Sequence, residues 1–516
     1  MRVERFLEDS AARFPTKTAL VCGDLRVTYA QLASAANRLA HALGLAGVER
    51  GDRVLLFLPN SSDAVAALFG VLKAGAVFSP INPTTKAGRL SYLMGNCQAR
   101  AVVTNRALLP VARDAAGRAE LDVAILTTDE LDWTSSKPTT PPQHGGIDMD
   151  VAMIIYTSGS TGLPKGVVMT HRNIEAAATS ITSYLENTPD DVILNALPLS
   201  FDYGLYQVLM SAKFGGTVVL EPSFAYPYLV IRKMAAEGVT GLPLVPTMAA
   251  ILLQMKDLKP GDLPRLRYIT NTGAALPPSH IQRLQQLFPT TRIYSMYGLT
   301  ECKRCTYLPP DQLGIRPLSV GKAIPNTEAY IVDERGERVG PGVVGELVIR
   351  GPHIMQGYWG DPEATAKRLR PGPYPWEKVL YTGDLFRMDD EGYLYFVGRQ
   401  DDIIKTRGVK VSPREVEDVL YSLPGVAEAV VVGTPDPILG MAVKAIIVRA
   451  AGSTIAAADV LRHCAAHLED YAVPKVVEFR SSLPKTDGGK IRRSDVQAEE
   501  LRACRDVQSV PAEACR

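Results

Sequence analysis

An excess of charge of either sign is missing from this 516-residue chain. Its 56 Lys and Arg residues are balanced by 55 Asp and Glu residues, so the formal net charge is +1. Proteins that bind nucleic acid or anionic membrane surfaces usually carry a basic patch or a basic excess. The composition therefore gives no sign of a polyanionic partner, and any charge on a ligand must be met by a few local side chains.

Cysteine is sparse, with seven residues at positions 22, 97, 302, 305, 464, 504 and 515. An odd, scattered set favours free thiols in a reducing compartment over a disulfide framework. Cys302 and Cys305 have the CxxC spacing of metal and redox sites, but no second CxxC or nearby histidine pair completes a zinc site.

Long apolar segments are also missing. The first 15 residues are charged throughout and contain no apolar core of a signal peptide. The most apolar stretch, 64–78, is interrupted by Lys73 and is shorter than the roughly 20 residues of a membrane span. We therefore expect a cytoplasmic protein without stable membrane insertion.

The length predicts two to four domains, at roughly 100–200 residues for each. Apolar spacing predicts a helix over 28–43 with Thr28 as its cap, and buried strands over 52–58 and 99–105 with a helix between them. This alternation predicts an α/β fold in which helices cover a parallel sheet.

Later segments indicate further units. Residues 134–148 are polar and rich in Pro and Gly, as in a surface loop, and 328–351 read as two strands of a β-rich subdomain. Beyond residue 398, a helix capped by Ser412, strands over 426–436 and 441–450 and a helix over 455–468 predict a compact α+β lobe. The predicted division is therefore 1–398 and 399–516.

The segment 156–167, YTSGSTGLPKGV, is rich in glycine and hydroxyl side chains and contains one cation, Lys165. Free backbone amides and hydroxyls suit phosphate oxygens. A Walker A loop is excluded because Gly166 follows Lys165, and the dinucleotide motif GxGxxG is missing. The alternative from composition alone is a flexible surface turn.

This segment closely resembles the phosphate loop of the adenylate-forming superfamily, which includes acyl-CoA synthetases, luciferases and the adenylation domains of peptide synthetases. Six further segments resemble the family in its order: 57–83, 297–301, 345–365, 381–385, 399–417 and 483–494. The resemblance implies a large N-terminal adenylation domain of layered sheets and helices with a β-rich subdomain, and a small mobile C-terminal lobe. It also implies that a carboxylate attacks the α-phosphate of ATP and that a thiol then displaces AMP.

The resemblance implies nucleotide-binding roles at matching positions. The loop residues hold the β- and γ-phosphates, with Lys165 either binding phosphate or supporting the loop. Thr300 reaches the α-phosphate and Glu301 holds Mg²⁺, unless these two residues only cap a helix. The remaining expected contacts are the loop residues Thr157, Ser158, Gly159, Ser160, Thr161 and Gly162, the adenine neighbours Gly273, Ala274 and Tyr297, and the ribose ligands Asp384 and Arg399.

The C-terminal lobe supplies Lys490, which the resemblance implies as the catalytic cation between the carboxylate and the α-phosphate. In isolation Lys490 reads as a solvated tail lysine, and Lys485 is a nearby alternative. By the same resemblance, Asp401 is the hinge about which the lobe rotates between half-reactions, and Gly408 lines the thiol tunnel.

The acid pocket is expected around 197–210. Ser200-Phe201-Asp202 is similar to amino-acid-activating domains, in which the aspartate pairs with the substrate ammonium group. The alternative is a structural Asp202 paired with Lys213 or a backbone amide. Other expected pocket residues are Tyr203, Tyr206, Pro243, Thr270, Thr272, Met296 and Arg304 or Cys305.

The direction of Arg304 separates two substrate classes. Facing inward, it suits an acid with an extra carboxylate or hydroxyl; facing outward, it leaves the pocket similar to that of standalone prolyl–carrier-protein ligases. The sequence thus predicts a standalone AMP-forming acid–thiol ligase for a small amino acid such as proline, with CoA or a separate carrier protein as acceptor. The alternatives are a fatty-acid or other acyl-CoA synthetase, a luciferase-like oxygenase and a binding module without catalysis.

Overall fold

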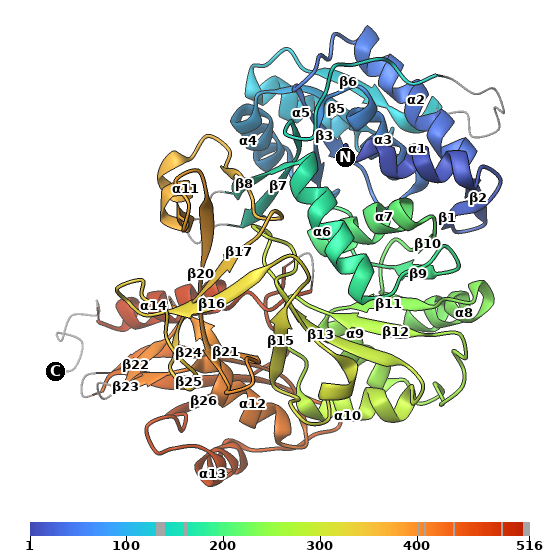
Figure 1. Cartoon of the computed structure of the whole chain (residues 1–516). Coiled ribbons are helices and arrows are strands. Elements are labelled where there is room, and N and C mark those ends of the chain that lie inside the picture. The colour runs from blue at the N-terminus through green and yellow to red at the C-terminus, as the bar shows by residue number, and fades with distance from the viewer. Residues whose placement is uncertain are drawn as a thin grey trace.

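The computed structural model describes residues 1–130, 140–158, 164–400, 402–406, 409–436, 439–486 and 489–508. Its strands form three sheets that are flanked by helices (Figure 1). The α/β fold predicted from the sequence is therefore confirmed. Within these ranges, no helix is both long enough and apolar enough to span a membrane.

The first sheet has seven strands in the order β18-β8-β7-β4-β3-β5-β6. Its strands β3 to β6 are parallel neighbours, and β7 pairs antiparallel with β8. The strands are β3 (Arg53–Phe57), β4 (Val77–Ile81), β5 (Ala99–Thr104), β6 (Ala124–Thr127), β7 (Val151–Ser158), β8 (Pro164–Thr170) and β18 (Gly357–Tyr358). The associated helices are α2 (Tyr29–Leu45), α3 (Ser62–Lys73), α4 (Ala87–Cys97), α5 (Leu109–Ala119) and the 3₁₀ turn η1 (Thr128–Glu130).

Strand β3 explains why this part of the chain reads as a continuous apolar run. Val54 and Leu56 belong to the core that includes α2 and α3, whereas Leu55 and Phe57 belong to the core that includes α4 and α5. A strand covered on both faces needs apolar residues at every position. The Thr28 cap is confirmed as well, because its hydroxyl accepts from the Gln31 amide at 3.2 Å.

The second sheet has a parallel half and an antiparallel half. The parallel half contains β1 (Thr18–Cys22), β9 (Val192–Asn195), β10 (Thr217–Leu220), β11 (Gly241–Leu244), β12 (Tyr268–Asn271) and β13 (Arg292–Tyr297), with β2 (Leu25–Thr28) antiparallel at its edge. Its helices are α1 (Glu4–Arg13), α6 (His171–Tyr184), α7 (Asp202–Phe214), α8 (Pro227–Glu237), α9 (Pro246–Gln254) and α10 (Pro278–Leu287).

The antiparallel half contains the strand pair predicted over 328–351, which is confirmed as β16 and β17. Its elements are β14 (Thr306–Leu308), η2 (Pro310–Gln312), β15 (Ser319–Ala323), β16 (Glu328–Val332), β17 (Gly345–Arg350), α11 (Pro362–Arg368), β19 (Leu369–Pro371), β20 (Lys378–Met388) and β21 (Leu394–Arg399).

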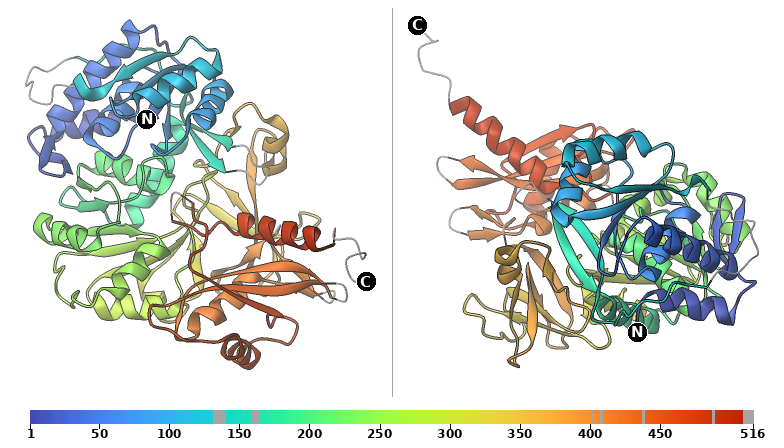
Figure 2. Two further views of the ribbon diagram at one scale, coloured as in Figure 1. Left: turned by 180° about the vertical axis from the view of Figure 1, so that it is seen from behind. Right: turned by 90° about the horizontal axis from the view of Figure 1, so that it is seen from above.

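The third sheet is formed only by residues after Arg399, and Figure 2 shows α14 lying across it. Its elements are β22 (Ile404–Thr406), β23 (Val409–Val411), α12 (Pro413–Ser422), β24 (Val426–Asp436), β25 (Gly440–Arg449), α13 (Ala457–His467), β26 (Val476–Arg480) and α14 (Arg493–Gln508). The predicted cap Ser412 accepts from the Glu415 amide at 3.3 Å, as expected for the start of α12.

Candidate active site

The phosphate-loop segment joins β7 to β8, an antiparallel pair in which Thr157 lies opposite Lys165. Four predicted loop residues lie outside the described residues: Gly159, Ser160, Thr161 and Gly162. Lys165 follows the loop, with its ammonium group 3.9 Å from the Asp361 carboxylate and 5.4 Å from the centre of the Tyr358 ring. The stem of the loop is thus in contact with β18.

Tyr358 also connects this stem to Glu301. Its hydroxyl donates a 2.6 Å hydrogen bond to Glu301 Oε1. Burial and the neighbouring carboxylate raise the pKa of Tyr358, so the phenol keeps its proton and acts as the donor. Among the hydrogen bonds of the described residues, none uses Glu301 Oε2, which leaves one carboxylate oxygen for a ligand. Mg²⁺ is commonly held by one or two carboxylates together with substrate phosphates, and this arrangement fits that requirement.

The predicted ribose ligands lie on neighbouring strands, because Asp384 of β20 is paired with Arg399 of β21. Asp384 is buried and accepts a 2.6 Å hydrogen bond from the Tyr297 hydroxyl, and Arg399 Nε lies 3.4 Å from its other oxygen. Burial raises the pKa of Asp384, while the charge of Arg399 opposes the shift. A buried carboxylate with two partners on one side is a suitable acceptor for a diol.

The predicted adenine neighbours follow the ends of adjacent parallel strands. Asn271 of β12 lies opposite Ser295 of β13, so Gly273 and Tyr297 each lie two residues beyond this pair. Gly273 has φ +86°, in the left-handed region that favours glycine, and Asn271 holds the next turn by donating to the Ala274 carbonyl at 2.9 Å. Ligands of open α/β sheets bind at this carboxyl edge.

Lys490 approaches the same corner from the segment between β26 and α14. The preceding Gly489 lies against α9, where a Cβ would come within 2.7 Å of Thr247 Oγ1. The crowded surroundings lower the pKa of Lys490 to about 8; Arg399 adds to the lowering and Asp384 opposes it. The Lys490 side chain itself is exposed, so water screens these interactions. It nevertheless lies within electrostatic range of the ribose corner.

Two predicted C-terminal positions, Asp401 and Gly408, lie outside the described residues. Beside the first, Asp402 accepts a 3.0 Å hydrogen bond from Arg493 Nη1, and the same guanidinium donates to Glu417 at 2.7 Å. The start of the lobe is therefore tied to α12 and α14 in this conformation.

The predicted acid-pocket residues come together around the first turns of α7. Asp202, Tyr203 and Tyr206 are buried on this helix, and the Tyr203 hydroxyl lies 2.8 Å from the Thr270 carbonyl oxygen, to which it donates. Thr272 and Met296 are also buried, one just beyond β12 and the other on β13. Helix α7 is thus in contact with the end of β12.

The structural partner suggested for Asp202 is wrong. Lys213 lies further along α7, near its end, where its ammonium group is 3.3 Å from Glu175. The cation nearest to Asp202 is instead Lys303 Nζ, at 3.8 Å from Oδ2. Lys303 is buried, and it also donates a 2.8 Å hydrogen bond to the Thr300 carbonyl.

Arg304 faces inward. Only 2% of its surface is exposed, and its guanidinium carbon lies 4.5 Å from the centre of the Tyr203 ring. The nearby thiols of Cys302 and Cys305 are buried and 2.9 Å apart, and burial raises the pKa of Cys302. No group of three or more His, Cys, Asp or Glu side chains suited to a metal ion occurs in the described ranges.

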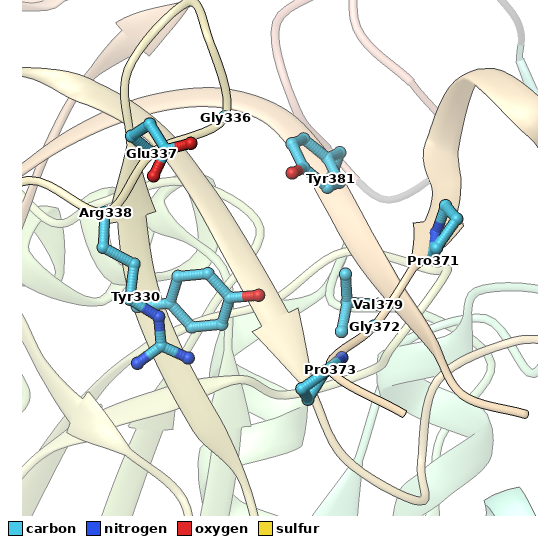
Figure 3. Close-up of a pocket in the computed structure, with 9 residues that line it drawn as sticks. All are labelled: Tyr330, Gly336, Glu337, Arg338, Pro371, Gly372, Pro373, Val379 and Tyr381. Carbon is cyan, nitrogen blue, oxygen red and sulfur yellow. The ribbon is translucent and has the colours of Figure 1, made fainter. Parts of the chain in front are cut away.

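A separate surface pocket of about 490 Å³ lies on the antiparallel half of the second sheet (Figure 3). Its walls include the rings of Tyr330 and Tyr381, on β16 and β20, with Arg338 at 3.8 Å from the centre of the Tyr330 ring. None of the predicted site residues lines it.

Comparison with known proteins agrees with this arrangement. Residues 7–359 match the model of the AMP-binding enzyme family, and residues 415–490 match the C-terminal domain of AMP-binding enzymes. This chain belongs to the AMP-binding enzyme family. The match confirms the resemblance inferred from the motifs and the predicted enzyme class, an AMP-forming ligase.

Similar proteins include both acyl-CoA ligases and a peptide synthetase. A long-chain-fatty-acid–CoA ligase of Bacillus subtilis (strain 168) is 32% identical over 96% of this chain and 94% of that protein. Tyrocidine synthase 2 of Brevibacillus parabrevis is 32% identical over 95% of this chain and 13% of that much longer protein. Among solved structures, ATP-bound MatB from Rhodopseudomonas palustris has a TM-score of 0.86 and 28% identity, covering 97% of this chain and 99% of that chain.

The motifs did not identify two residues of the site. Tyr358 lies within the resembling segment 345–365, but nothing local shows that its hydroxyl reaches Glu301, 57 positions earlier in the chain. Lys303 lies in the CKRC segment between Cys302 and the predicted pocket residue Arg304. This position beside Arg304 was the only signal for it in the sequence.

Proposed function

We propose that this chain joins a short polar carboxylic acid to a thiol at the expense of ATP. A carboxylate oxygen bonds to the α-phosphorus, and the bond to the β-phosphate oxygen breaks, which releases pyrophosphate. The thiolate sulfur then bonds to the acyl carbon, and the bond to the AMP oxygen breaks. The observation that carries this proposal is the approach of Glu301, Asp384 and Lys490 to one carboxyl edge from three separate parts of the chain.

In this proposal the first step is catalysed mainly by positioning and charge neutralisation, because two anions must meet. Lys490 neutralises charge between the carboxylate and the α-phosphate. Asp384 and Arg399 orient the ribose, Tyr297 covers the adenine, and Thr300 contacts the α-phosphate. Glu301, oriented by the hydrogen bond from Tyr358, is the residue that would hold Mg²⁺, which when bound would neutralise charge on the phosphates.

We also propose the domain division 1–398 and 399–516, with rotation of the second part about Asp401. The third sheet is formed only by residues of the second part, and Lys490 is its contribution to the adenylation site. The ties from Arg493 to Asp402 and Glu417 would keep the start of the lobe fixed to its helices during rotation. Gly408 would line the thiol tunnel after the movement.

The acceptor in this proposal is CoA or a separate carrier protein, as the relatives include CoA ligases and a peptide synthetase. A small amino acid such as proline is a second candidate substrate. It is favoured by Asp202, whose carboxylate lies 3.8 Å from Lys303 without a close hydrogen bond and could accept an ammonium group. A long alkyl chain is disfavoured by the buried rings of Tyr203 and Tyr206.

The test is acid-dependent exchange of pyrophosphate into ATP, measured over short acids, amino acids, fatty acids and aryl acids. Lys490→Ala should reduce exchange at least a hundred-fold, since removal of a transition-state charge contact costs roughly 10²–10³ in rate. Lys485→Ala is the matched control, because Lys485 lies in the same segment but pairs with Glu428. Equal rates in the two variants, or no exchange with any acid, would contradict the proposed function.

A further inference from the structure

The turn after Glu301 forces two cations into the protein interior. Lys303 has φ +65°, a left-handed conformation that is uncommon for a residue with a Cβ. Its amide donates to the Leu299 carbonyl at 2.7 Å, and the Cys305 amide donates to the Tyr297 carbonyl at 2.9 Å. At Gly298 a Cβ would collide with the Lys303 carbonyl at 1.8 Å. This tight turn explains why Lys303 and Arg304 are both directed toward α7.

Arg304 lacks a counter-ion in this interior. Within the described part of the chain, no carboxylate lies within ion-pair distance of its guanidinium, and its Nε is buried without a hydrogen bond. The contact with the Tyr203 ring lies against the face of the guanidinium and satisfies none of its N–H groups. Breaking or omitting the partner of a buried charge is strongly destabilising, so this arrangement requires an explanation.

A second buried polar atom is unpartnered nearby. The Tyr206 hydroxyl makes no hydrogen bond to the described residues, although its ring is fully buried and lies 5.8 Å from the Lys303 ammonium group. Tyr206 interacts electrostatically with both Arg304 and Asp202. Two donors, the Arg304 guanidinium and the Tyr206 phenol, therefore occur in one buried region without an acceptor among the described residues.

The side chains around Arg304 cannot supply the missing negative charge. Burial raises the pKa of Tyr203 to about 12, and it also raises the pKa values of Tyr184 and Tyr206, so these phenols are neutral at physiological pH. Asp202 lies 3.8 Å from Lys303, which also interacts electrostatically with Glu301, and burial lowers the pKa of Lys303. Neither carboxylate forms an ion pair with Arg304, so the Arg304 guanidinium is the group without an anionic partner among the described residues.

The position of the unpaired Arg304 charge links it to the predicted acid pocket. Lys303 donates to the carbonyl of Thr300, the residue proposed to contact the α-phosphate, and Arg304 lies on the ring of Tyr203, a predicted pocket residue. Arg304 also interacts electrostatically with Tyr184, which stacks on Tyr307 at 4.1 Å and donates to Met296 Sδ at 3.0 Å. Because Thr300 and Arg304 are four residues apart in one tight turn, a short acid activated at Thr300 can bring a second group to Arg304.

We propose that the substrate is a short acid with a second anionic group, a carboxylate or a sulfonate, which binds to the Arg304 guanidinium and the Tyr206 hydroxyl. This inference rests on the proposed ligase function and names its substrate class. The second anion pairs with the Arg304 charge and accepts hydrogen bonds from the two unused donors. An ammonium group would instead place a positive charge beside the unpaired Arg304 guanidinium.

Matched acids of equal chain length test this assignment by pyrophosphate exchange: malonate against propionate, succinate against butyrate and sulfoacetate against acetate, with proline and glycine beside them. The wild-type protein should prefer the dianionic member of at least one pair by about ten-fold or more in kcat/KM, the scale of a charge-assisted hydrogen-bonded contact. Comparison of the dicarboxylates with sulfoacetate distinguishes the two kinds of second anion.

Arg304→Met should bring that ratio to within about two-fold, as expected when one charge-assisted contact is lost. It should also raise the thermal unfolding midpoint of the ligand-free protein, because an unpaired buried charge is replaced by an apolar side chain of similar length. Lys213→Met is the control, because Lys213 lies near the end of α7 and is paired with Glu175; it should leave the ratio unchanged. A purely structural Arg304 would give the opposite signature: a lower midpoint and an unchanged ratio.

The failures of the two proposals differ. Exchange with proline or with monocarboxylates in preference to their dianionic partners would overturn the second-anion assignment and leave the ligase function standing. No exchange with any acid would refute the ligase function, and the substrate class would fall with it.

Discussion

The hydrogen bond from Tyr358 to Glu301 allows a quantitative prediction. Tyr358→Phe removes the 2.6 Å bond to Glu301 Oε1 and keeps the ring on which Lys165 rests. A hydrogen bond to a charged group contributes about 1.5–3 kcal/mol. Tyr358 is half-buried, so water partly replaces the lost donor and the lower end, about 1.5 kcal/mol, applies.

This free energy corresponds to about a ten-fold effect. We therefore expect Tyr358→Phe to raise the Mg²⁺ concentration for half-maximal pyrophosphate exchange about ten-fold, because Glu301 is no longer held in one orientation. Tyr421→Phe is the control, since it removes a hydroxyl that bonds to the Ala429 backbone in the third-sheet region.

A double-mutant cycle with Glu301→Gln completes the test. If Tyr358 acts through Glu301, the Tyr358→Phe effect should be lost in the Glu301→Gln background. An unchanged Mg²⁺ requirement in the single variant would refute the reasoning that Tyr358 orients a metal ligand. Additive effects of the two substitutions would show that the residues act independently.

Two further predictions concern pH and stability. Because Lys490 acts in its charged form and its pKa is lowered to about 8, the rate of pyrophosphate exchange should fall about ten-fold per pH unit well above pH 8. The Lys490→Arg variant should show this fall at higher pH. A wild-type rate that stays flat to about pH 10 would exclude Lys490 as the titrating group. Arg267→Met should cost about 3 kcal/mol of unfolding free energy at pH 7, because it removes the 2.7 Å partner of the buried Asp191 carboxylate. Burial raises the pKa of Asp191, but its hydrogen bonds, that from Arg267 foremost, lower it by more. The stabilisation is therefore complete above pH of about 4 and is lost as the pH falls through the folded-state pKa of Asp191. The unfolding midpoints of the wild-type protein and the Arg267→Met variant should differ less near pH 3.5 than at pH 7.

The Cys302–Cys305 segment shows what a spacing pattern leaves out. The CxxC spacing is that of metal and redox sites, whereas the structure buries the two cations between the cysteines, Lys303 and Arg304. The left-handed conformation at Lys303 turns both cations inward, and no rule of periodicity predicts it for a lysine.

The sequence alone determined the local elements and the family. Thr28 and Ser412 cap their helices because a hydroxyl and a backbone amide a few positions later interact within one turn. The two-sided apolar run of β3 similarly contains the information that helices cover both faces of its sheet. Glycine-rich and charged motifs also predicted the nucleotide-binding residues, since such chemistry depends on residue type and spacing.

Only the tertiary structure decided which charges meet. Asp202 is near Lys303 and not Lys213, Arg304 points inward, and Glu301 is held by Tyr358. Lys490, between β26 and α14, lies within electrostatic range of Asp384. These contacts join residues from about 57 to more than 100 positions apart. They depend on strand order and on the turn at Lys303, because electrostatic interactions follow distance in space, which the spacing of residues along a chain does not encode.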